Sequence, residues 1–382
     1  MEAMLKLKVM TVLGTRPEII RLSRVMAMLD RYVDHVIVHT GQNWDYDLNE
    51  VFFTDLQVRK PDYFLGVDVS SLGAVLGGIL IETEKVISAE KPDAVLILGD
   101  TNSAIAAIIA RRMKVPVYHM EAGNRSFDRN VPEETNRRLV DHVSDFNLVY
   151  TEHARRHLLS EGIHHRRIYV TGSPMNEVLN HYRSAIEKSD VLQRLNLTEN
   201  SYFVASLHRE ENVDIPARLQ QLIDSLNSIA EIYDCPVIVS THPRTRKRLD
   251  QLEEISLDDR VQYMKPFGFH DYNFLQMNAK CVISDSGTIA EESSMLGFPG
   301  VTPRDAIERP EAIDTGAVIF TGLNRENLVS GVQLAIDMFS ESQTRGARVN
   351  IPQDYTVENT AERVVKLICG SARLSNSWDG IR

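Results

Sequence analysis

The chain has 382 residues, of which 43% are hydrophobic and 25% charged, and its formal net charge is -11. This composition excludes wholesale disorder, and the negative charge argues against a nucleic-acid-binding surface. The length favours two domains over a single core. No apolar stretch is long enough to cross a bilayer, and the amino terminus runs straight into a strand-like segment, so we expect a soluble cytoplasmic protein that is not bound to a membrane.

The first half of the chain alternates short apolar segments with amphipathic ones. Helical spacing of apolar residues predicts helices at 18–32, 103–113 and 152–161, the last capped by Thr151 and ended by Gly162. Strands alternating with helices indicate βαβ units around a parallel sheet. The predicted strands are 9–13, 35–40, 94–98, 115–119, 147–150 and 168–171.

The pattern weakens between 173 and 201, where polar, Asn-rich sequence predicts a linker with a helix, and then resumes. A long helix is predicted at 215–233, and an amphipathic stretch at 357–369 is expected to pack back onto the first domain. We predict an α/β protein with two Rossmann-like, doubly wound domains facing a cleft, at 1–175 and 176–356. The predicted strands of the second domain are 202–207, 237–241, 261–264, 282–284, 300–302 and 318–321.

The three cysteines, Cys235, Cys281 and Cys369, lie far apart without the spacing of a metal site. Cys235 and Cys281 fall in apolar, strand-like runs. We expect buried free thiols, as in proteins of a reducing compartment.

Polar motifs follow the predicted strands, where an open α/β sheet places its ligands. The motif GTRPE (14–18) puts Arg16 at the start of a helix, where backbone amides favour an anion. Arg21 adds a second cation one turn later. The alternative is turn chemistry with a solvated arginine, but the two cations favour an anion site.

Carboxylates follow the next strands. Asp100 in GDTN is either a helix N-cap or a functional group, and Glu121 in EAG ends the neighbouring strand. Glu133 and Glu134 begin another helix. Carboxylates that converge on one site repel each other and raise at least one pKa, which suits general acid and base work. Asp100, Glu121, Glu133 and Glu134 are therefore candidates for acid and base work.

A basic cluster follows the first strands of the second domain. His208 and Arg209 belong to HREEN (208–212), and His242 opens HPRTRKR (242–248). A lone histidine is more often a satisfied surface residue, and the 242–248 run can be a solvated helix face. The cluster as a whole favours an anion, and we assign His208 a catalytic role and Arg209 and His242 a substrate-binding role.

The motif SDSGTIAEE (284–292) is the most specific signal of the second half. Ser286, Gly287 and Thr288 expose backbone N–H groups that can cradle a diphosphate, and Glu292 can hold a ribose diol. Helix capping explains the hydroxyl residues but not the glycine between them. Arg309 in ERPE (308–311) is expected to reach the same phosphates. No dinucleotide fingerprint, P-loop or metal-ligand spacing is present, so no cofactor and no metal are predicted.

Together these motifs resemble the non-hydrolysing UDP-N-acetylglucosamine 2-epimerase family, from Val9 to about Thr321. The resemblance implies a glycosyltransferase-B arrangement of two Rossmann-like domains, a UDP-sugar substrate and a homodimer. It also implies that Asp100, Glu121 and Glu133 are the catalytic carboxylates, while Phe267 in KPFGF lies near the uracil. Further residues of the UDP-sugar site implied by the resemblance are Arg16, His208, Ser286, Gly287, Thr288, Glu292 and Arg309.

The chain departs from the common bacterial pattern at several motifs. Arg21 stands where that pattern has lysine, EAG is followed by NRSFDRN, and 40–53 replaces the segment that binds an activating second UDP-sugar. These variants, with HREENVD and STHPRTRKR, resemble the branch that forms UDP-N-acetyl-L-fucosamine from UDP-2-acetamido-2,6-dideoxy-L-talose for capsule or O-antigen synthesis. We prefer this branch. The alternatives are a UDP-N-acetylglucosamine/UDP-N-acetylmannosamine epimerase, a hydrolysing epimerase, a glycosyltransferase and a silent UDP-sugar-binding regulator.

Overall fold

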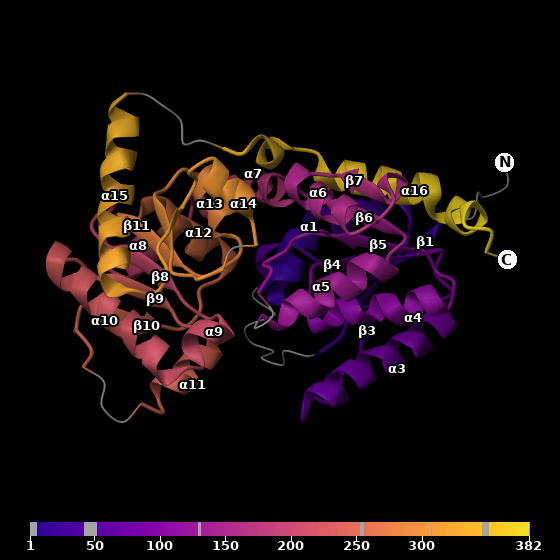
Figure 1. Ribbon diagram of the computed structural model, residues 1–382, viewed down its shortest axis with the longest axis horizontal. Coiled ribbons are helices and arrows are strands. Elements are labelled where there is room, and N and C mark those ends of the chain that lie inside the picture. Colours follow the sequence, from indigo (N-terminus) through magenta and orange to yellow (C-terminus); the bar gives the residue numbers. More distant parts are fainter. Residues whose placement is uncertain are drawn as a thin grey trace. The chain divides into compact units, whose positions relative to one another are not determined.

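Figure 1 shows the computed structural model of the chain, which describes residues 6–41, 52–128, 131–252, 256–306, 308–345 and 351–381. The segment 40–53, which replaces the activator-binding segment of the common bacterial pattern, lies mostly outside these residues. The chain divides into two compact units, Met1–Asn180 with Gln353–Arg382, and His181–Pro352. These boundaries differ from those expected at 175 and 356. Helix α7 (Met175–Ile186) begins at the first expected boundary and continues past Asn180, where this part of the first unit ends.

The first unit contains a seven-stranded sheet in the order β3-β2-β1-β4-β5-β6-β7, with every pair parallel. Its central strands are buried along their whole length, as expected for a parallel sheet covered on both faces. The strands are β1 (Lys8–Leu13), β2 (Asp34–His39), β3 (Tyr63–Phe64), β4 (Ala94–Leu98), β5 (Val117–Met120), β6 (Phe146–Val149) and β7 (Ile168–Val170).

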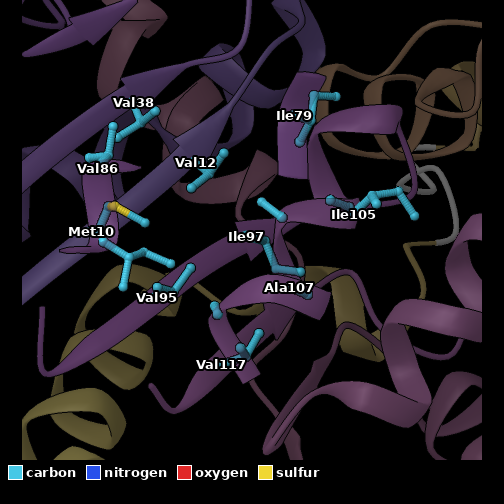
Figure 2. Packing of buried hydrophobic residues seen from close by; sticks show 14 of the residues in the cluster. Met10, Val12, Val38, Ile79, Val86, Val95, Ile97, Ile105, Ala107 and Val117 are labelled. Atoms are coloured by element: carbon cyan, nitrogen blue, oxygen red, sulfur yellow. The ribbon is translucent and has the colours of Figure 1, made fainter. Parts of the chain in front are cut away.

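Helices cover both faces of this sheet (Figure 1). On one face, α3 and α4 pack a core of aliphatic side chains onto the strands, and Figure 2 shows Met10 and Val95 facing Val86 and neighbouring residues. On the other face, α16 packs against α1, and the Tyr118 hydroxyl is 2.7 Å from Ser371 Oγ. Besides α7, the helices of this unit are α1 (Arg16–Tyr32), α3 (Leu72–Glu90), α4 (Ala106–Arg112), α5 (Pro132–Val143), α6 (Glu152–Ser160) and α16 (Thr360–Trp378). The unit also has 3-10 turns at Asn102–Ile105, His165–Arg167 and Gln353–Thr356.

The second unit repeats this topology with six parallel strands in the order β10-β9-β8-β11-β12-β13. Its core joins the sheet to α10 and α15. The strands are β8 (Phe203–Ser206), β9 (Val237–Ser240), β10 (Val261–Met264), β11 (Cys281–Ser284), β12 (Gly300–Thr302) and β13 (Ile319–Phe320). The helices are α8 (Val191–Arg194), α9 (Glu210–Val213), α10 (Pro216–Tyr233), α11 (Pro243–Leu249), α12 (Phe269–Asn278), α13 (Ile289–Leu296), α14 (Pro310–Asp314) and α15 (Arg325–Thr344).

The predicted α/β class with two doubly wound parallel sheets is confirmed, while some details differ. The sequence did not predict β3, which has only two residues, and the helix predicted at 103–113 begins with a 3-10 turn. Cys281 is buried in β11 as expected, and burial raises the pKa of its thiol to about 12. Cys235 is only half-buried, because it precedes β9. None of the described helices is long and apolar enough to span a bilayer.

Candidate active site

The strand order places one switch point in each sheet, between β1 and β4 and between β8 and β11. At such a point the loops after the two strands run in opposite directions, which leaves room for a ligand beyond their carboxyl ends. All the strongest motifs of the sequence follow these strands or their neighbours. We therefore describe one group of residues in each unit.

In the first unit, Glu18 joins the loops after β1 and β4. Its carboxylate is buried and accepts hydrogen bonds from the backbone N–H of Gly14 (3.1 Å) and the Thr15 hydroxyl (2.7 Å), and also from the Ser103 hydroxyl. Burial raises the pKa of Glu18. Turn chemistry thus accounts for part of the GTRPE motif. Arg16 has a different environment, with its guanidinium 5.7 Å from the centre of the Phe52 ring.

Asp100 follows β4 and is held by a residue of α5. Arg137 Nε lies 2.9 Å from Asp100 Oδ2, and the Asn136 amide donates to the Asp100 carbonyl oxygen at 3.0 Å. The N-cap alternative for Asp100 is wrong, because Thr101 occupies the cap position of the 3-10 turn. The sequence analysis missed Arg137, although its position three residues after Glu134 is a sign of a helical ion pair.

Glu121 follows β5 in a left-handed backbone conformation, with φ of 64°. Its carboxylate pairs with the guanidinium of Arg21, and both side chains are almost fully buried. A Cβ atom added at Gly99 would lie 3.5 Å from Glu121 Oε2, so this carboxylate rests against the residue before Asp100. The expected closeness of the two loops is present, and Arg21, predicted to bind substrate, contacts Glu121.

The two glutamates that begin α5 differ in environment. Glu134 is buried and accepts from the Ser126 N–H, Arg137 and Arg138 at 2.9–3.0 Å. Burial opposes ionisation of Glu134, but these donors outweigh it and lower its pKa. Glu133 is half-exposed in the first turn of the helix. Crowding of carboxylates does not raise the pKa of Glu134 itself, because Ser126 and two arginines stabilise its ionised form.

In the second unit, Asp285 organises the loops after β8 and β11. This fully buried carboxylate accepts from the backbone N–H groups of His208 (3.0 Å) and Arg209 (3.1 Å) and from Asn212 Nδ2 (3.0 Å). His208 Nδ1 is 3.2 Å from it. Burial alone would raise the pKa of Asp285, but His208 and the other donors lower it to about 2. The sequence analysis missed Asp285, although it follows its strand directly.

The segment after Asp285 begins helix α13. The Ser286 and Thr288 hydroxyl oxygens are 2.8 Å apart, and Ser286 Oγ accepts from the Thr288 N–H at 3.3 Å. These contacts belong to a turn before the helix, and the capping alternative is wrong, because the cap residue Thr288 makes no side-chain cap hydrogen bond. Neither contact accounts for Gly287, where an added Cβ would lie 3.4 Å from Arg209 Nη2. Glycine thus allows the Arg209 guanidinium to approach the backbone.

Glu292 lies in α13, and Glu308 and Arg309 come directly before α14. Arg309 is buried and its Nη1 is 2.7 Å from the Glu291 carboxylate. Glu292 is also buried and accepts from Gln276 Nε2 at 2.8 Å. Glu308 lies 3.5 Å from Arg209 Nη2. Local carboxylates therefore fix the direction of both arginines, as a prearranged anion site requires.

His242 follows β9, which is beside β8, and Phe267 follows β10, the next strand out. The His242 ring is 5.8 Å from that of His208 and its Nδ1 accepts from the Arg244 N–H, which caps α11. Arg246 and Lys247 are exposed, so the helix-face alternative is correct for this part of the 242–248 run. Phe267 is half-buried between β10 and α12. Among the described residues, no three His, Cys, Asp or Glu side chains form a group that could hold a metal ion.

Comparison with known proteins shows to which family the chain belongs. The family model for UDP-N-acetylglucosamine 2-epimerase matches residues 27–369. The chain belongs to the UDP-N-acetylglucosamine 2-epimerase family. The predicted L-fucosamine branch within it is not shown by these matches. Members of the family are isomerases, so the chain is placed among enzymes and not among structural proteins.

Two similar proteins support the same family assignment. The chain is 39% identical to the UDP-N-acetylglucosamine 2-epimerase of Methanocaldococcus jannaschii over 87% of this chain and 93% of that protein. It is 35% identical to the UDP-2,3-diacetamido-2,3-dideoxy-D-glucuronate 2-epimerase of Pseudomonas aeruginosa over 86% of this chain and 92% of that protein. The family thus includes similar proteins with different sugar substrates.

Solved structures of this epimerase family have the same fold. The UDP-N-acetylglucosamine 2-epimerase of Rickettsia bellii is 42% identical with a TM-score of 0.89, covering 97% of this chain and 98% of that one. The M. jannaschii enzyme in complex with UDP-GlcNAc and UDP is 36% identical with a TM-score of 0.87, covering 96% and 100%. The rhamnosyltransferase SpnG, 12% identical with a TM-score of 0.57, covering 94% and 99%, shows the glycosyltransferase-B-like fold alone.

Proposed function

We propose that this member of the epimerase family inverts C2 of a UDP-2-acetamido sugar by eliminating UDP and adding it back. The observation that carries the proposal is the pairing of Asp100 and Glu121 with arginines on adjacent loops of the first unit. The second unit supplies two arginines, Arg209 and Arg309, whose guanidinium groups lie beside Glu308 and Glu291. Carboxylates suit proton transfer at the sugar, and the donors suit the diphosphate.

The chemistry follows from the weak acidity of C2–H, which has no neighbouring carbonyl group. A carboxylate takes this proton while the C1–O bond breaks and UDP leaves with the bonding electron pair, so that a C1=C2 double bond forms in a 2-acetamidoglycal. A second acid then protonates C2 from the opposite face, and a UDP oxygen forms the C1–O bond again. Protons and electrons balance without a redox cofactor.

Each group of residues has a proposed role in this sequence. Asp100, Glu121 and Glu133 share the proton transfers and stabilise positive charge at C1. Arg209, Arg309, His208 and the loop 286–288 stabilise the diphosphate charge, and Arg16 is a proposed anion-binding residue of the first unit. Phe267 and His242 are proposed at the nucleotide end and Glu292 at the ribose. Fixed donors act best on charge that develops during the reaction.

The first substrate candidate is UDP-N-acetylglucosamine, interconverted with UDP-N-acetylmannosamine. The names of the M. jannaschii and R. bellii relatives support it, as does the complex of the former with UDP-GlcNAc and UDP. The relative that acts on a diacetamido-glucuronate supports some variation in substrate within the family.

The second candidate is UDP-2-acetamido-2,6-dideoxy-L-talose, with a role in surface polysaccharide synthesis. It is supported by the motif variants Arg21 and NRSFDRN and by the HREENVD and STHPRTRKR segments. Two of these variants are built into the first unit, since Arg21 pairs with Glu121 and Arg125 pairs with Asp141 and Glu161. A change at Arg21 therefore bears directly on a proposed catalytic carboxylate.

Incubation with each UDP-sugar in D₂O, followed by NMR, tests the proposal. We expect solvent deuterium at C2 of the product from one of the two substrates. Turnover without deuterium at C2 would exclude the elimination route. Free sugar with UDP would indicate a hydrolysing enzyme, a requirement for an acceptor would indicate a transferase, and binding without turnover a regulator. We also expect a homodimer, which light scattering measures.

A further inference from the structure

His119 is a fully buried histidine of β5 that the proposed reaction does not use. Its Nε2 lies 2.8 Å from the carbonyl oxygen of Gly99, the residue before Asp100. Its Nδ1 lies 2.9 Å from Asp141 Oδ1, on α5. A carbonyl oxygen can only accept a hydrogen bond, so Nε2 carries a hydrogen.

Asp141 also acts as an acceptor toward its other neighbours. Arg125 Nη1 donates to Asp141 Oδ2 at 2.7 Å, and the Gly123 N–H donates to the same oxygen at 3.2 Å. Glu161 holds the other side of the Arg125 guanidinium, and this contact helps to lower the pKa of Glu161 to about 2. Asp141 thus accepts from Arg125 and Gly123, and His119 Nδ1 lies within ion-pair distance of its other oxygen without the alignment of a hydrogen bond.

The pair of side chains joins two loops that carry proposed catalytic groups. One end reaches the carbonyl before Asp100, and the other reaches the amide two residues after Glu121. The backbone between these points is unusual, because Gly99, Glu121 and Gly123 all have positive φ. A left-handed conformation at a glutamate is strained and persists only where the surroundings enforce it.

We propose that His119 and Asp141 form a positioning pair that sets the Asp100 and Glu121 carboxylates for the reaction. This inference rests on the proposed function for its catalytic consequence. His119 takes no part in proton transfer. It affects the reaction only through the position of the backbone that it contacts. A displacement of about 1 Å at a reacting group can reduce a rate by about 100-fold.

Two variants of His119 separate positioning from general stability. The amide nitrogen of asparagine lies near the place of Nδ1, whereas that of glutamine lies near the place of Nε2. We expect His119→Asn to keep a polar group beside Asp141, lose the hydrogen bond to Gly99 and lower kcat by about 100-fold. We expect His119→Gln to keep the Gly99 contact and regain at least about tenfold, with KM within about threefold for both variants.

The chain offers a matched control in His35, another buried histidine with an aspartate partner. Its Nδ1 lies 2.7 Å from Asp30 and its Nε2 lies 2.8 Å from Thr11 Oγ1, at the opposite end of the same sheet. We expect His35→Asn to lower the melting temperature while kcat stays within about twofold. Equal losses of kcat for the two His119 variants, or losses that simply follow melting temperature, would overturn the proposal.

A crystal structure of His119→Asn tests the pair independently of turnover. We expect the Gly99–Asp100 peptide to rotate away from its place in the wild-type structure. Superposition of residues 99–101 and 121–123 without a shift would overturn the inference even if the wild-type enzyme is active. A wild-type enzyme that converts neither UDP-sugar would overturn the proposed function instead, while the structural result still decides the role of the pair.

Discussion

The two units have the same strand order around their switch points, yet they carry opposite chemistry there. In the first unit, the loops after β4 and β5 present carboxylates, and each is paired with an arginine from a neighbouring helix. In the second, the loops after β8 and β12 present Arg209 and Arg309, whose guanidinium groups lie beside buried carboxylates. Topology thus selects the place of a site, and the side chains select what it does.

The same contrast extends to the buried acid that joins the loops in each unit. The donors to Glu18 are an amide and two hydroxyls, which are neutral and do not compensate for burial, so its pKa is raised. Asp285 has His208 beside it as well as amide donors, and its pKa is lowered to about 2. The charge of the donors therefore decides which way burial moves a carboxylate.

The largest expected effect comes from the carboxylates of the first unit. We expect Asp100→Asn and Glu121→Gln each to lower kcat by about 1,000-fold, because a proton donor or acceptor is lost. UDP affinity should remain within about threefold, since the proposed diphosphate site lies in the second unit. Steady-state kinetics and calorimetry measure the two quantities. Glu152→Gln, at an exposed carboxylate of α6, is the control; a comparable loss of UDP affinity in the site variants would contradict the division of roles.

A smaller effect is expected from Asp285→Asn in the second unit. Because the folded pKa of about 2 is below the unfolded value of about 3.9, Asp285 stabilises the fold above pH 4, and this contribution is lost as the pH falls through 2. The variant should lose on the order of 2 kcal/mol at pH 7. Denaturant unfolding between pH 2 and 7 measures it, and a difference from wild type that stays constant across this range would count against the prediction.

Gly287→Ala should act on affinity alone. The added methyl group would lie beside Arg209 and the N–H groups of α13, so we expect UDP affinity to fall by about tenfold with no change in melting temperature. Gly370→Ala is a matched control, because this glycine of α16 has open space around it. Unchanged UDP binding in Gly287→Ala would place the diphosphate away from α13.

The smallest effect is expected from Glu18→Gln. The raised pKa of Glu18 means that wild-type stability declines as the pH rises from about 4.5 through its folded pKa, which is the opposite sign to Asp285. Glutamine cannot accept from all three donors, and we expect a loss of about 1 kcal/mol at pH 4.5 that narrows at higher pH. Thermal unfolding measured from pH 4.5 to 8 tests this, and a gap that widens with pH would refute it.

The sequence by itself determined the α/β class, the alternation of elements and the loops that carry polar groups. Apolar runs mark parallel strands because both faces of such strands are buried, and GTRPE, GDTN, EAG and SDSGT therefore stood out at strand ends. Helix ends and the two-residue strand β3 were less clear, because short elements leave little periodicity.

Only the tertiary structure decided which side chains face each other. Arg21 meets Glu121 across 100 residues, and His208 meets Asp285 across 77, so no local spacing reveals either pair. The same is true of His119, whose partners come from β4 and α5. Strand pairing and helix packing bring these groups together, and the charge of each partner then fixes whether a buried carboxylate stays ionised.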